Sequence, residues 1–449
     1  MAINEKIFKS YDIRGTYPDQ LNEEAAYAVG RAFALRVVAL GEKQAVVGSD
    51  MRLSGPALKK ELIAGITDQG VDVVDVGLVP IDCVYASVGI FGYPAGIMIT
   101  ASHNPKEYNG FKMVLKDMQW VRGEELKAEV LNLPAAISEQ KGQVAEVDLM
   151  SKYIKHVLSF VDLKKIKSFK VVVDAGNGMA GKFVPMLAEH LPIEIVPLNF
   201  ELDGNFPAHP SNPLMPESQV QISQAVKEHR ADFGVIFDGD TDRLFFVDEQ
   251  GAFIRADYTL LVLAKEFLQR EPGRGIVYNV ICSKMVPQKI TEWGGVPLRS
   301  KVGYVNVATM MRAHNGIMGG ELSAHYSFRD NAYSDSGAIA WLILLQLISE
   351  DGRKLSEIVG EFAKYFKSDE INLEIEDRQA VVDAVKQKYL DGRQDELDGL
   401  TVDYDNWWFN IRASNTEPVL RVTIEAESPA VLAAKQAELI GLIEAINQQ

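Results

Sequence analysis

Val-Val-Val-Asp-Ala-Gly-Asn-Gly, residues 171–178, joins three β-branched residues to a glycine-rich segment, which predicts a buried strand followed by a turn. The same plan recurs on both sides of this stretch. Other strand-like apolar runs lie at residues 44–48, 71–76, 96–100, 233–237 and 275–280. Helical periodicity is found between such runs, as at residues 55–69 and 218–229. This alternation predicts an α/β fold with mixed sheets covered by helices.

The length of the chain indicates several domains. Its 449 residues exceed what one hydrophobic core usually supports, which favours three or four domains. Because the strand-and-turn plan restarts at Val171 and again at Gly275, we predict three similar α/β domains, at residues 1–148, 149–250 and 251–366. After about residue 366 the chain is more charged and ends in a strand-like block, which predicts a smaller α+β domain at residues 367–449.

Composition and charge exclude several classes of protein. The formal charge of −16 argues against a nucleic-acid or anionic-membrane surface, so a phosphate ligand must be bound by local basic groups. The first residues lack the features of a secretory signal, and the apolar run 338–348 is too short to span a bilayer and predicts a buried helix. Cys83 and Cys282 are far apart in sequence, which suggests neither a disulfide framework nor a zinc site. We therefore expect a cytoplasmic protein, and no obligate protein partner is indicated.

The segment Thr-Ala-Ser-His-Asn-Pro, residues 100–105, follows a predicted buried strand. Ligands of open α/β sheets bind beyond the carboxyl ends of strands, so we expect Ser102 to lie exposed at a site of chemistry. A serine hydroxyl needs a base, and His103 or Lys112 would handle the proton if the turn signal Asn109-Gly110 folds Lys112 back toward the serine. Taken alone, the segment fits better with Ser102 and Asn104 as capping or turn residues, and Lys112 fits a solvated surface lysine.

Asp238, Asp240 and Asp242 follow a second buried strand at alternate positions. Carboxylates this close repel one another by roughly 4 kcal/mol per pair at an intermediate dielectric, so they need a cation. Oxygen ligands favour Mg²⁺ or Ca²⁺. Arg243, the next residue, would neutralise a phosphoryl group beside the metal.

An EF-hand loop is the competing interpretation, since Glu249 falls at the twelfth position of such a loop. Arg243 occupies the sixth position, where glycine is required, and both flanks are strand-like rather than helical. We therefore reject the EF-hand.

Two further segments carry groups suited to a sugar phosphate. Glu321 and Ser323 follow two glycines and offer acceptors for vicinal hydroxyls, although a simple glycine turn fits as well. Arg412 and the small polar residues 414–416 would form an anion cradle from a guanidinium and turn amides, with a plain polar turn as the alternative. Near the N-terminus, Arg14 would meet the serine site.

Taken together and in this order, the four segments resemble those of the α-D-phosphohexomutase superfamily over essentially the whole chain, and in particular its bacterial phosphomannomutase and phosphomannomutase/phosphoglucomutase members. The resemblance implies four domains, three similar α/β units and a smaller C-terminal one, around a central cleft. The coincidence of four segments is far more specific than any one of them.

The resemblance also implies a role for each matching residue. Ser102 would be a phosphoserine that shares one Mg²⁺ with three carboxylates, those of Asp238, Asp240 and Asp242. Residues near the transferring group would be Tyr11, Arg14, His103, Lys112 and Arg243, with Lys112 or His103 as acid/base. Residues that contact the sugar would be Lys301, Gly303, Tyr304, Glu321, Ser323 and His325. Residues that hold the second phosphate would be Arg412, Ser414, Asn415, Thr416 and Arg421.

Two positions depart from the family pattern. Leu322 stands where methionine is commoner, and Tyr304 stands where histidine is often found after the glycine. The form of the Glu321 segment resembles that of the mannose and glucose enzymes rather than that of the glucosamine enzymes.

The implied activity is that of a phosphomannomutase, which interconverts mannose 6-phosphate and mannose 1-phosphate through phospho-Ser102 and a bound 1,6-bisphosphate. Hexose phosphates would be its partners, and a hexose 1,6-bisphosphate its activator. Three alternatives stay open: an enzyme that prefers glucose phosphates, a metal-dependent sugar phosphatase, and a non-catalytic phosphosugar- or calcium-binding protein.

Overall fold

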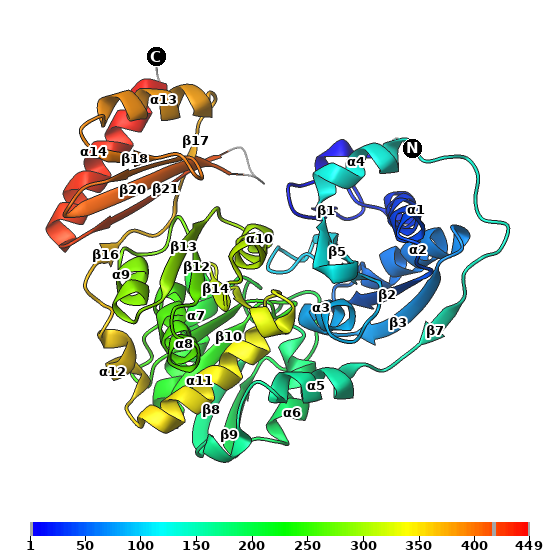
Figure 1. Ribbon diagram of the computed structural model, residues 1–449, viewed down its shortest axis with the longest axis horizontal. Coiled ribbons are helices and arrows are strands. Elements are labelled where there is room, and N and C mark those ends of the chain that lie inside the picture. Colours follow the sequence, from blue (N-terminus) through cyan, green and yellow to red (C-terminus); the bar gives the residue numbers. More distant parts are fainter. Residues whose placement is uncertain (1–2, 415–418, 448–449) are drawn as a thin grey trace. The chain divides into compact units, whose positions relative to one another are not determined.

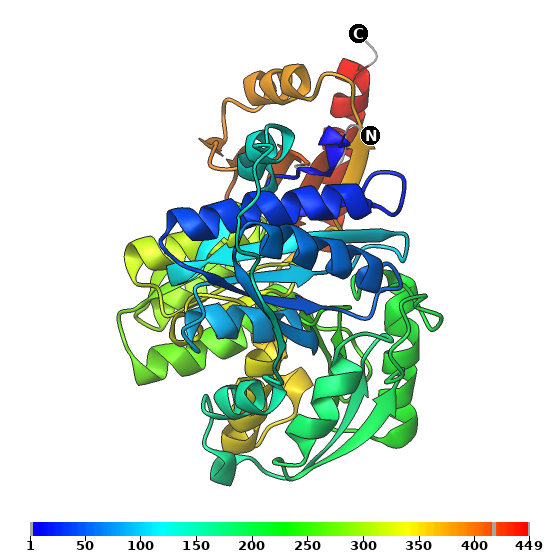
Figure 2. The same ribbon diagram turned by 90° about the vertical axis from the view of Figure 1, so that its right-hand side faces the viewer.

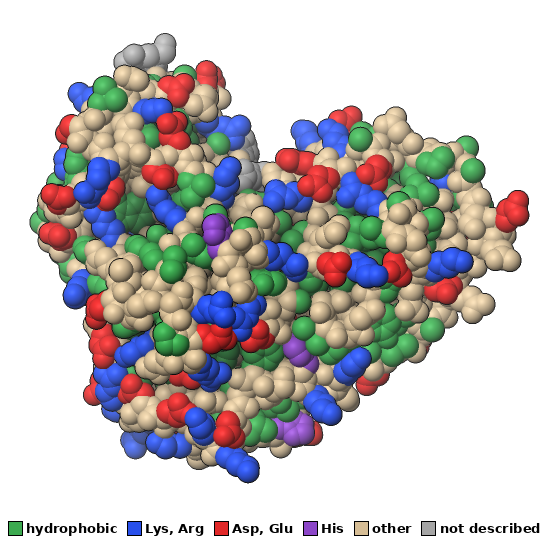
Figure 3. Space-filling view, viewed as in Figure 1, with side chains coloured by type: hydrophobic (Ala, Val, Ile, Leu, Met, Phe, Trp, Pro, Cys, Tyr) green, Lys and Arg blue, Asp and Glu red, His purple; other side chains and the backbone are tan. Residues whose placement is uncertain are grey.

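The computed structural model describes residues 3–414 and 419–447. The chain divides into two compact units, one of residues 1–259 with 323–358 and one of residues 260–322 with 359–449 (Figure 1). Among the described residues, no helix combines the length and the apolar character needed to cross a membrane. On the face drawn in Figure 3, basic and acidic side chains are interspersed.

The first sheet of the first unit is mixed, as the sequence predicts. Its strand order is β1-β5-β4-β2-β3-β7, with β6 beside β5. β2, β3, β4 and β7 run parallel, whereas β5 is antiparallel to its neighbours β4, β1 and β6. The strands are β1 (Ile13–Thr16), β2 (Gln44–Ser49), β3 (Asp72–Leu78), β4 (Ala95–Ile99), β5 (Tyr108–Leu115), β6 (Gln119–Val121) and β7 (Val144–Glu146), and the helices are α1 (Glu23–Ala39), α2 (Gly55–Asp68), α3 (Ile81–Gly89) and α4 (Gly123–Leu131).

Helices α1 and α2 lie side by side and pack against each other (Figure 2). A Cβ atom on Gly30 would lie 2.3 Å from the carbonyl oxygen of Leu62, and one on Gly65 would lie 2.2 Å from that of Tyr27. The two glycines therefore set the distance between the helices, because any side chain would meet main-chain atoms of the partner helix.

The second sheet of this unit has the order β11-β10-β8-β9. β8, β9 and β10 are parallel, and β11 is antiparallel to β10. Helix α11 confirms the buried helix predicted at residues 338–348, since nearly all its side chains are enclosed. Further elements of the first unit are α5 (Met150–Leu158), β8 (Phe169–Asp174), α6 (Ala180–Ala188), β9 (Ile193–Leu198), α7 (Pro216–His229), β10 (Phe233–Phe237), β11 (Leu244–Val247), β15 (Tyr326–Phe328), which is not part of this sheet, and α11 (Gly337–Asp351).

The second unit holds a third parallel set of strands and a C-terminal sheet. β12 lies between β13 and β14 and is parallel to both, whereas the C-terminal sheet is antiparallel throughout. The strands are β12 (Gly275–Asn279), β13 (Val296–Ser300), β14 (Met318–Gly320), β16 (Phe366–Lys367), β17 (Ile371–Glu374), β18 (Arg393–Asp395), β19 (Leu400–Asp403), β20 (Trp407–Ala413) and β21 (Val419–Ala426). The helices are α9 (Met285–Glu292), α10 (Tyr304–His314), α13 (Arg378–Lys388) and α14 (Pro429–Asn447), while α8 (Ala256–Arg270) and α12 (Leu355–Gly360) extend across the boundaries between the units. The fold thus consists of three sheets with helices in the α/β manner, followed by a C-terminal α+β domain.

Candidate active site

Ser102 lies in the loop between β4 and β5, at the carboxyl end of β4. Its hydroxyl donates a hydrogen bond to Asp238 Oδ2 at 2.7 Å, and its main-chain N–H donates to Thr100 Oγ1 at 2.9 Å. The residue has a φ of 51°, in the left-handed region that L-residues seldom adopt. Only 1% of Ser102 is exposed, so the expectation of an exposed serine is wrong: the corner between β10 and β11 covers it.

That corner carries the three aspartates. Asp238, Asp240 and Asp242 are all buried, and one carboxylate oxygen of each lies within 4.8 Å of the others. The main-chain N–H of Thr241 donates to Asp238 Oδ1 at 3.1 Å and fixes the turn. The flanking elements are strands, in agreement with the rejection of an EF-hand.

Lys112 reaches the same carboxylates from β5. Its Nζ donates to Asp240 Oδ2 at 3.0 Å and to Asp242 Oδ2 at 2.6 Å, and only 3% of the residue is exposed. The alternative of a surface lysine is therefore wrong. The predicted turn at Asn109-Gly110 is wrong as well, because both residues lie inside β5 and pair with β1. The chain reverses earlier, so that Lys112 lies opposite Met98 of β4.

Two of the three carboxylates, those of Asp238 and Asp242, differ in the direction of their pKa shifts. Burial, together with the negative charges of Asp242 and Asp240, raises the pKa of Asp238 well above its usual value. Burial acts in the same direction on Asp242, but the nearby Lys112 and His325 hold its pKa well below the usual value. Carboxylates in contact with both a lysine and one another are a site that a hard cation would stabilise.

The donor set fits a divalent cation. Asp240 Oδ1 is buried and accepts no hydrogen bond from any residue that the structure describes, whereas Asp242 Oδ1 is paired with His325. Buried oxygens without donors are costly unless a cation is bound. Three carboxylates and the Ser102 hydroxyl are hard oxygen ligands, so they suit Mg²⁺ better than a thiophilic metal.

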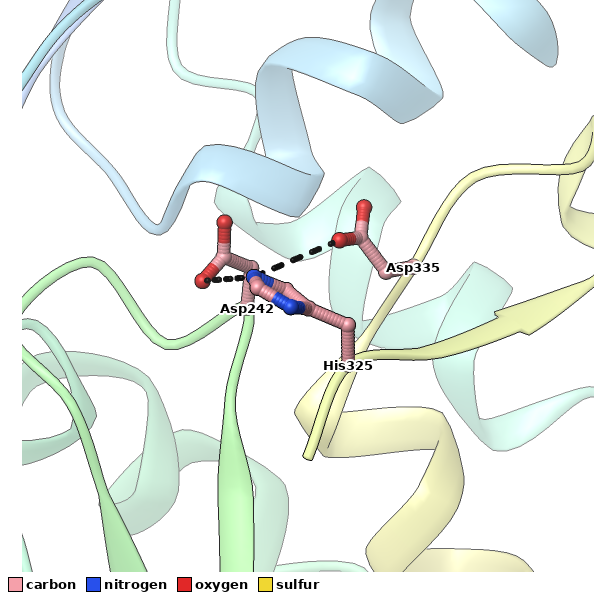
Figure 4. Close-up of side chains that lie close together, drawn as sticks. All are labelled: Asp242, His325 and Asp335. Carbon is pink, nitrogen blue, oxygen red and sulfur yellow. Dashed lines mark ion pairs between the residues drawn. The ribbon is translucent and has the colours of Figure 1, made fainter. Parts of the chain in front are cut away.

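His325 lies between two aspartates beside this cluster (Figure 4). Its Nε2 is 3.4 Å from Asp242 Oδ1 and 3.9 Å from Asp335 Oδ2, and its Nδ1 is 2.9 Å from Ser323 Oγ. The Arg243 guanidinium donates from Nε to His325 Nε2 at 3.3 Å. Burial and the charge of Asp242 raise the pKa of Asp335 to about 7. Ser323 and His325 thus join the carboxylate cluster through Arg243 and Asp242.

Arg14 and His103 complete the surroundings of Ser102. Arg14, on β1, donates to Asn104 Oδ1 of the serine loop at 2.5 Å. His103 Nδ1 lies 3.3 Å from Ser102 Oγ. Burial, followed by the positive charges of Arg243 and Arg14, lowers the pKa of His103 well below its usual value, so the ring is neutral near pH 7. The Tyr11 ring lies under the guanidinium of Arg122, 5.7 Å from ring centre to carbon.

In the second unit, Glu321 is held by its own chain. It is buried, and its Oε1 accepts hydrogen bonds from the main-chain N–H of Gly303 at 2.6 Å and from Asn279 Nδ2 at 3.1 Å. Gly303 has a φ of 116°, which permits this approach at the start of α10, where Tyr304 is buried and Lys301 is exposed. The structure therefore brings Gly303 and Glu321 together, while the sugar contacts of all four residues stay predictions.

Arg412 and Arg421 lie opposite each other on β20 and β21. Both guanidinium groups reach Glu370, Arg412 at 2.7 Å and Arg421 at 3.3 Å. Two arginines that converge on one carboxylate form a site of suitable charge for a phosphate. Ser414 follows on the same strand end and donates its N–H to Val419, whereas Asn415 and Thr416 lie outside the described residues.

Sequence reasoning missed four buried or partly buried charged residues that contact these groups, namely Asp50, Arg52, Asp335 and Glu370. Asp50 and Arg52 follow directly on β2, which runs parallel to β4, so the rule that located Ser102 at the carboxyl end of its strand also applies to them. Asp335 and Glu370 had no such signal, because neither follows an apolar strand or belongs to a glycine-rich motif.

Comparison with known proteins extends over the whole chain. The family phosphoglucomutase/phosphomannomutase matches through its alpha/beta/alpha domain I at residues 5–132, domain II at 151–251 and domain III at 255–365, and through its C-terminal domain at 370–442. The chain is 40% identical to a protein of Xanthomonas campestris pv. campestris named phosphohexose mutases, over 95% of this chain and 96% of that one. It is 37% identical to a phosphomannomutase of Vibrio cholerae, over 98% of each.

Its structure is similar to that of a phosphoglucomutase/phosphomannomutase family protein of Burkholderia thailandensis. The TM-score is 0.91 at 34% sequence identity, over 99% of this chain and 98% of the other.

Proposed function

Since the chain belongs to the phosphoglucomutase/phosphomannomutase family and is therefore a phosphohexomutase, an isomerase of carbohydrate metabolism, we propose that it interconverts mannose 6-phosphate and mannose 1-phosphate with Ser102 as phosphoryl carrier. Relatives named for both sugars favour glucose phosphates as further substrates.

One observation carries this proposal. The Ser102 hydroxyl lies 2.7 Å from Asp238 Oδ2, within a buried group of three carboxylates that also holds the Lys112 ammonium. A serine hydroxyl that donates to a buried carboxylate beside a buried ammonium is well placed to carry a group that a metal and cations stabilise.

In the proposed reaction, phospho-Ser102 donates its phosphoryl group to the free hydroxyl of a hexose monophosphate. The bond between phosphorus and Ser102 Oγ breaks as a bond to the sugar oxygen forms, and the proton of the sugar hydroxyl is passed through a side chain of the site to Ser102 Oγ. His103 is placed to give the leaving Ser102 oxygen its proton, since its Nδ1 lies 3.3 Å from Ser102 Oγ, whereas the Lys112 ammonium is engaged by two carboxylates. The bisphosphate then turns end for end, and its other phosphate returns to Ser102.

Charge stabilisation supplies most of the catalysis of phosphoryl transfer. Arg243 and Arg14 bring two guanidinium groups to the loop and the corner that hold Ser102. Mg²⁺, held by Asp238, Asp240 and Asp242 with one oxygen of the phosphoserine, would neutralise charge on the transferring group. The family is metal-dependent, and these carboxylates are the ligands available in the serine site.

The remaining predicted residues would recognise the sugar phosphate. Glu321, Ser323 and His325 would contact the hydroxyls, with Lys301, Gly303 and Tyr304 beside them. Arg412, Arg421 and Ser414 would bind the phosphate that is not reacting, in the place where the two arginines now meet Glu370.

The test combines mass and rate measurements. Intact-mass analysis should find one phosphate on the protein after incubation with a hexose 1,6-bisphosphate, and Ser102→Ala should abolish both the added mass and the mutase activity. Coupled assays with mannose 1-phosphate and glucose 1-phosphate show which substrate reacts faster. Repeating them with a chelator shows whether the activity depends on a metal ion. An unphosphorylated wild-type protein with full activity, or an active Ser102→Ala variant, would refute the carrier.

A further inference from the structure

Arg52 is a buried arginine to which the proposed function assigns no role. It follows β2, and its side chain is completely enclosed. Its guanidinium donates four hydrogen bonds to main-chain carbonyl oxygens of one loop, those of Ser102 at 2.8 Å, Asn104 at 2.6 Å, Pro105 at 2.8 Å and Tyr108 at 2.9 Å. One side chain therefore supports nearly the whole loop from Ser102 to the first residue of β5.

The guanidinium is itself held in place from the other side. Asp50 Oδ2 lies 3.3 Å from Arg52 Nε, and Asp50 Oδ1 accepts the main-chain N–H of Arg52 at 3.0 Å. The ring of Phe206 packs against the guanidinium, 5.1 Å from the ring centre. Contacts other than those with the loop therefore hold the Arg52 guanidinium in place. A side chain can fix another group in one position only when it is itself held in this way.

The contact with Ser102 bears directly on its hydroxyl. Ser102 has a φ of 51°, and its carbonyl oxygen accepts from Arg52 while its hydroxyl donates to Asp238. A Cβ atom on Gly239 would lie 2.8 Å from the same carbonyl oxygen, so the corner of the carboxylates closes over it. An unfavourable backbone conformation persists only where its surroundings enforce it, and here Arg52 and Gly239 enclose the carbonyl.

We propose that Arg52 is a positioning residue for phosphoryl transfer, which acts through the main chain of residues 102–108 to aim the Ser102 oxygen at the carboxylate cluster. The inference rests on the proposed function, in which Ser102 carries the phosphoryl group. Lysine cannot replace Arg52, because an ammonium lacks the planar fork that serves four carbonyls at once. Asp50 keeps the fork oriented.

The experiment compares Arg52→Lys and Arg52→Ala with the wild type. We expect kcat to fall about 100-fold in both, since a small misplacement of a reacting group costs about that much, while KM for the hexose phosphate changes little. Added guanidinium ion, at concentrations that leave the circular dichroism spectrum unchanged, should restore part of the kcat of Arg52→Ala by entering the vacated space. Arg36→Ala is the matched control, because Arg36 also donates a fork of hydrogen bonds, to Glu129 on the surface.

The outcomes separate this inference from the proposed function. Arg52 supports only the fold if both Arg52 variants keep the wild-type kcat. The same conclusion follows if kcat falls in proportion to the loss of thermal stability and added guanidinium does not restore it. If Arg52→Ala does not fold, a wild-type kcat in Arg52→Lys alone overturns the inference. The absence of phosphate from wild-type Ser102 rejects the carrier itself, whatever the Arg52 variants do.

Discussion

Replacing Asp82 with asparagine should remove a pH dependence from the stability of the protein. Asp82 is buried in α3 and accepts hydrogen bonds from the Tyr153 hydroxyl at 2.5 Å and the Ser336 hydroxyl at 2.6 Å. These three residues join α3, α5 and the N-terminal cap of α11. Burial raises the pKa of Asp82 from 3.8 to about 7, although both hydrogen bonds act in the opposite direction. An asparagine oxygen would still accept both hydroxyls but would never ionise.

The sign and size of the effect follow from linkage. The folded protein keeps the Asp82 proton up to about pH 7, whereas the unfolded chain loses it near pH 4, so unfolding releases a proton between these values. The free energy of unfolding therefore falls as the pH rises through this window. One pKa unit corresponds to about 1.4 kcal/mol, so the two units between pH 5 and pH 7 make a loss of about 3 kcal/mol. Above pH 7 the loss from this group stops.

Urea unfolding at pH 5, 6, 7 and 8, followed by circular dichroism, measures the difference between wild type and Asp82→Asn. Between pH 5 and pH 8, we expect the free energy of unfolding of the variant to rise by about 3 kcal/mol relative to that of the wild type. Asp68→Asn is the control, since Asp68 also accepts a tyrosine hydroxyl, from Tyr27 at 2.7 Å, but its pKa is lowered, first by the hydrogen bond from Lys141. The free energy of unfolding of Asp68→Asn should therefore differ from that of the wild type by the same amount at every pH in this range. Parallel profiles for Asp82→Asn and wild type would refute the reasoning.

Three further predictions test the site and the fold. Lys112→Met should destabilise the metal-free protein by about 3 to 5 kcal/mol, seen as a lower thermal midpoint, because the buried carboxylates lose their cation. Added Mg²⁺ should restore part of the lost stability, and an equal loss with and without Mg²⁺ would contradict this prediction. Glu370→Gln should lower KM for hexose phosphates several-fold at constant kcat in a coupled assay, since it removes the anion now bound to Arg412 and Arg421; an unchanged KM would show that Glu370 does not compete. Gly30→Ala should destabilise the protein by about 1 to 3 kcal/mol in thermal unfolding, because its Cβ would meet a main-chain oxygen of α2, and a neutral result would mean that the helices move apart freely.

The carboxylate cluster was predictable because its chemistry is local. Asp238, Asp240 and Asp242 are at alternate positions after an apolar strand, and their mutual repulsion follows from spacing alone. Ser102 was located in the same way, by the end of its strand. Their direct contact was not predictable from either segment, since it requires the sheet of β4 and the sheet of β10 to meet at their carboxyl ends.

The errors arise where tertiary pairing overrides a local signal. Asn109-Gly110 is a strong turn signal, yet β1 pairs with β5 across these residues and keeps them extended. Ser102 was expected to be exposed because a strand end usually is, and nothing near it in sequence indicates that Gly239 closes over its carbonyl. The role of Arg52 could not be predicted from the sequence, because its partners are main-chain oxygens some fifty residues away. Any residue type supplies such an oxygen, so the contact leaves no pattern in the sequence.

The charges around Ser102 explain why an acidic pocket suits a phosphoryl carrier. A dianionic phosphate beside three carboxylates is opposed by roughly 4 kcal/mol for each close pair, so such a site would expel it unless cations were present. Lys112 and Arg243 supply two positive charges against the three carboxylates. A divalent cation then gives the group a net positive charge, and the phosphoserine returns it to a net negative one. Metal and phosphoryl group therefore stabilise each other, and the acidic residues, which repel phosphate on their own, make its retention depend on the metal.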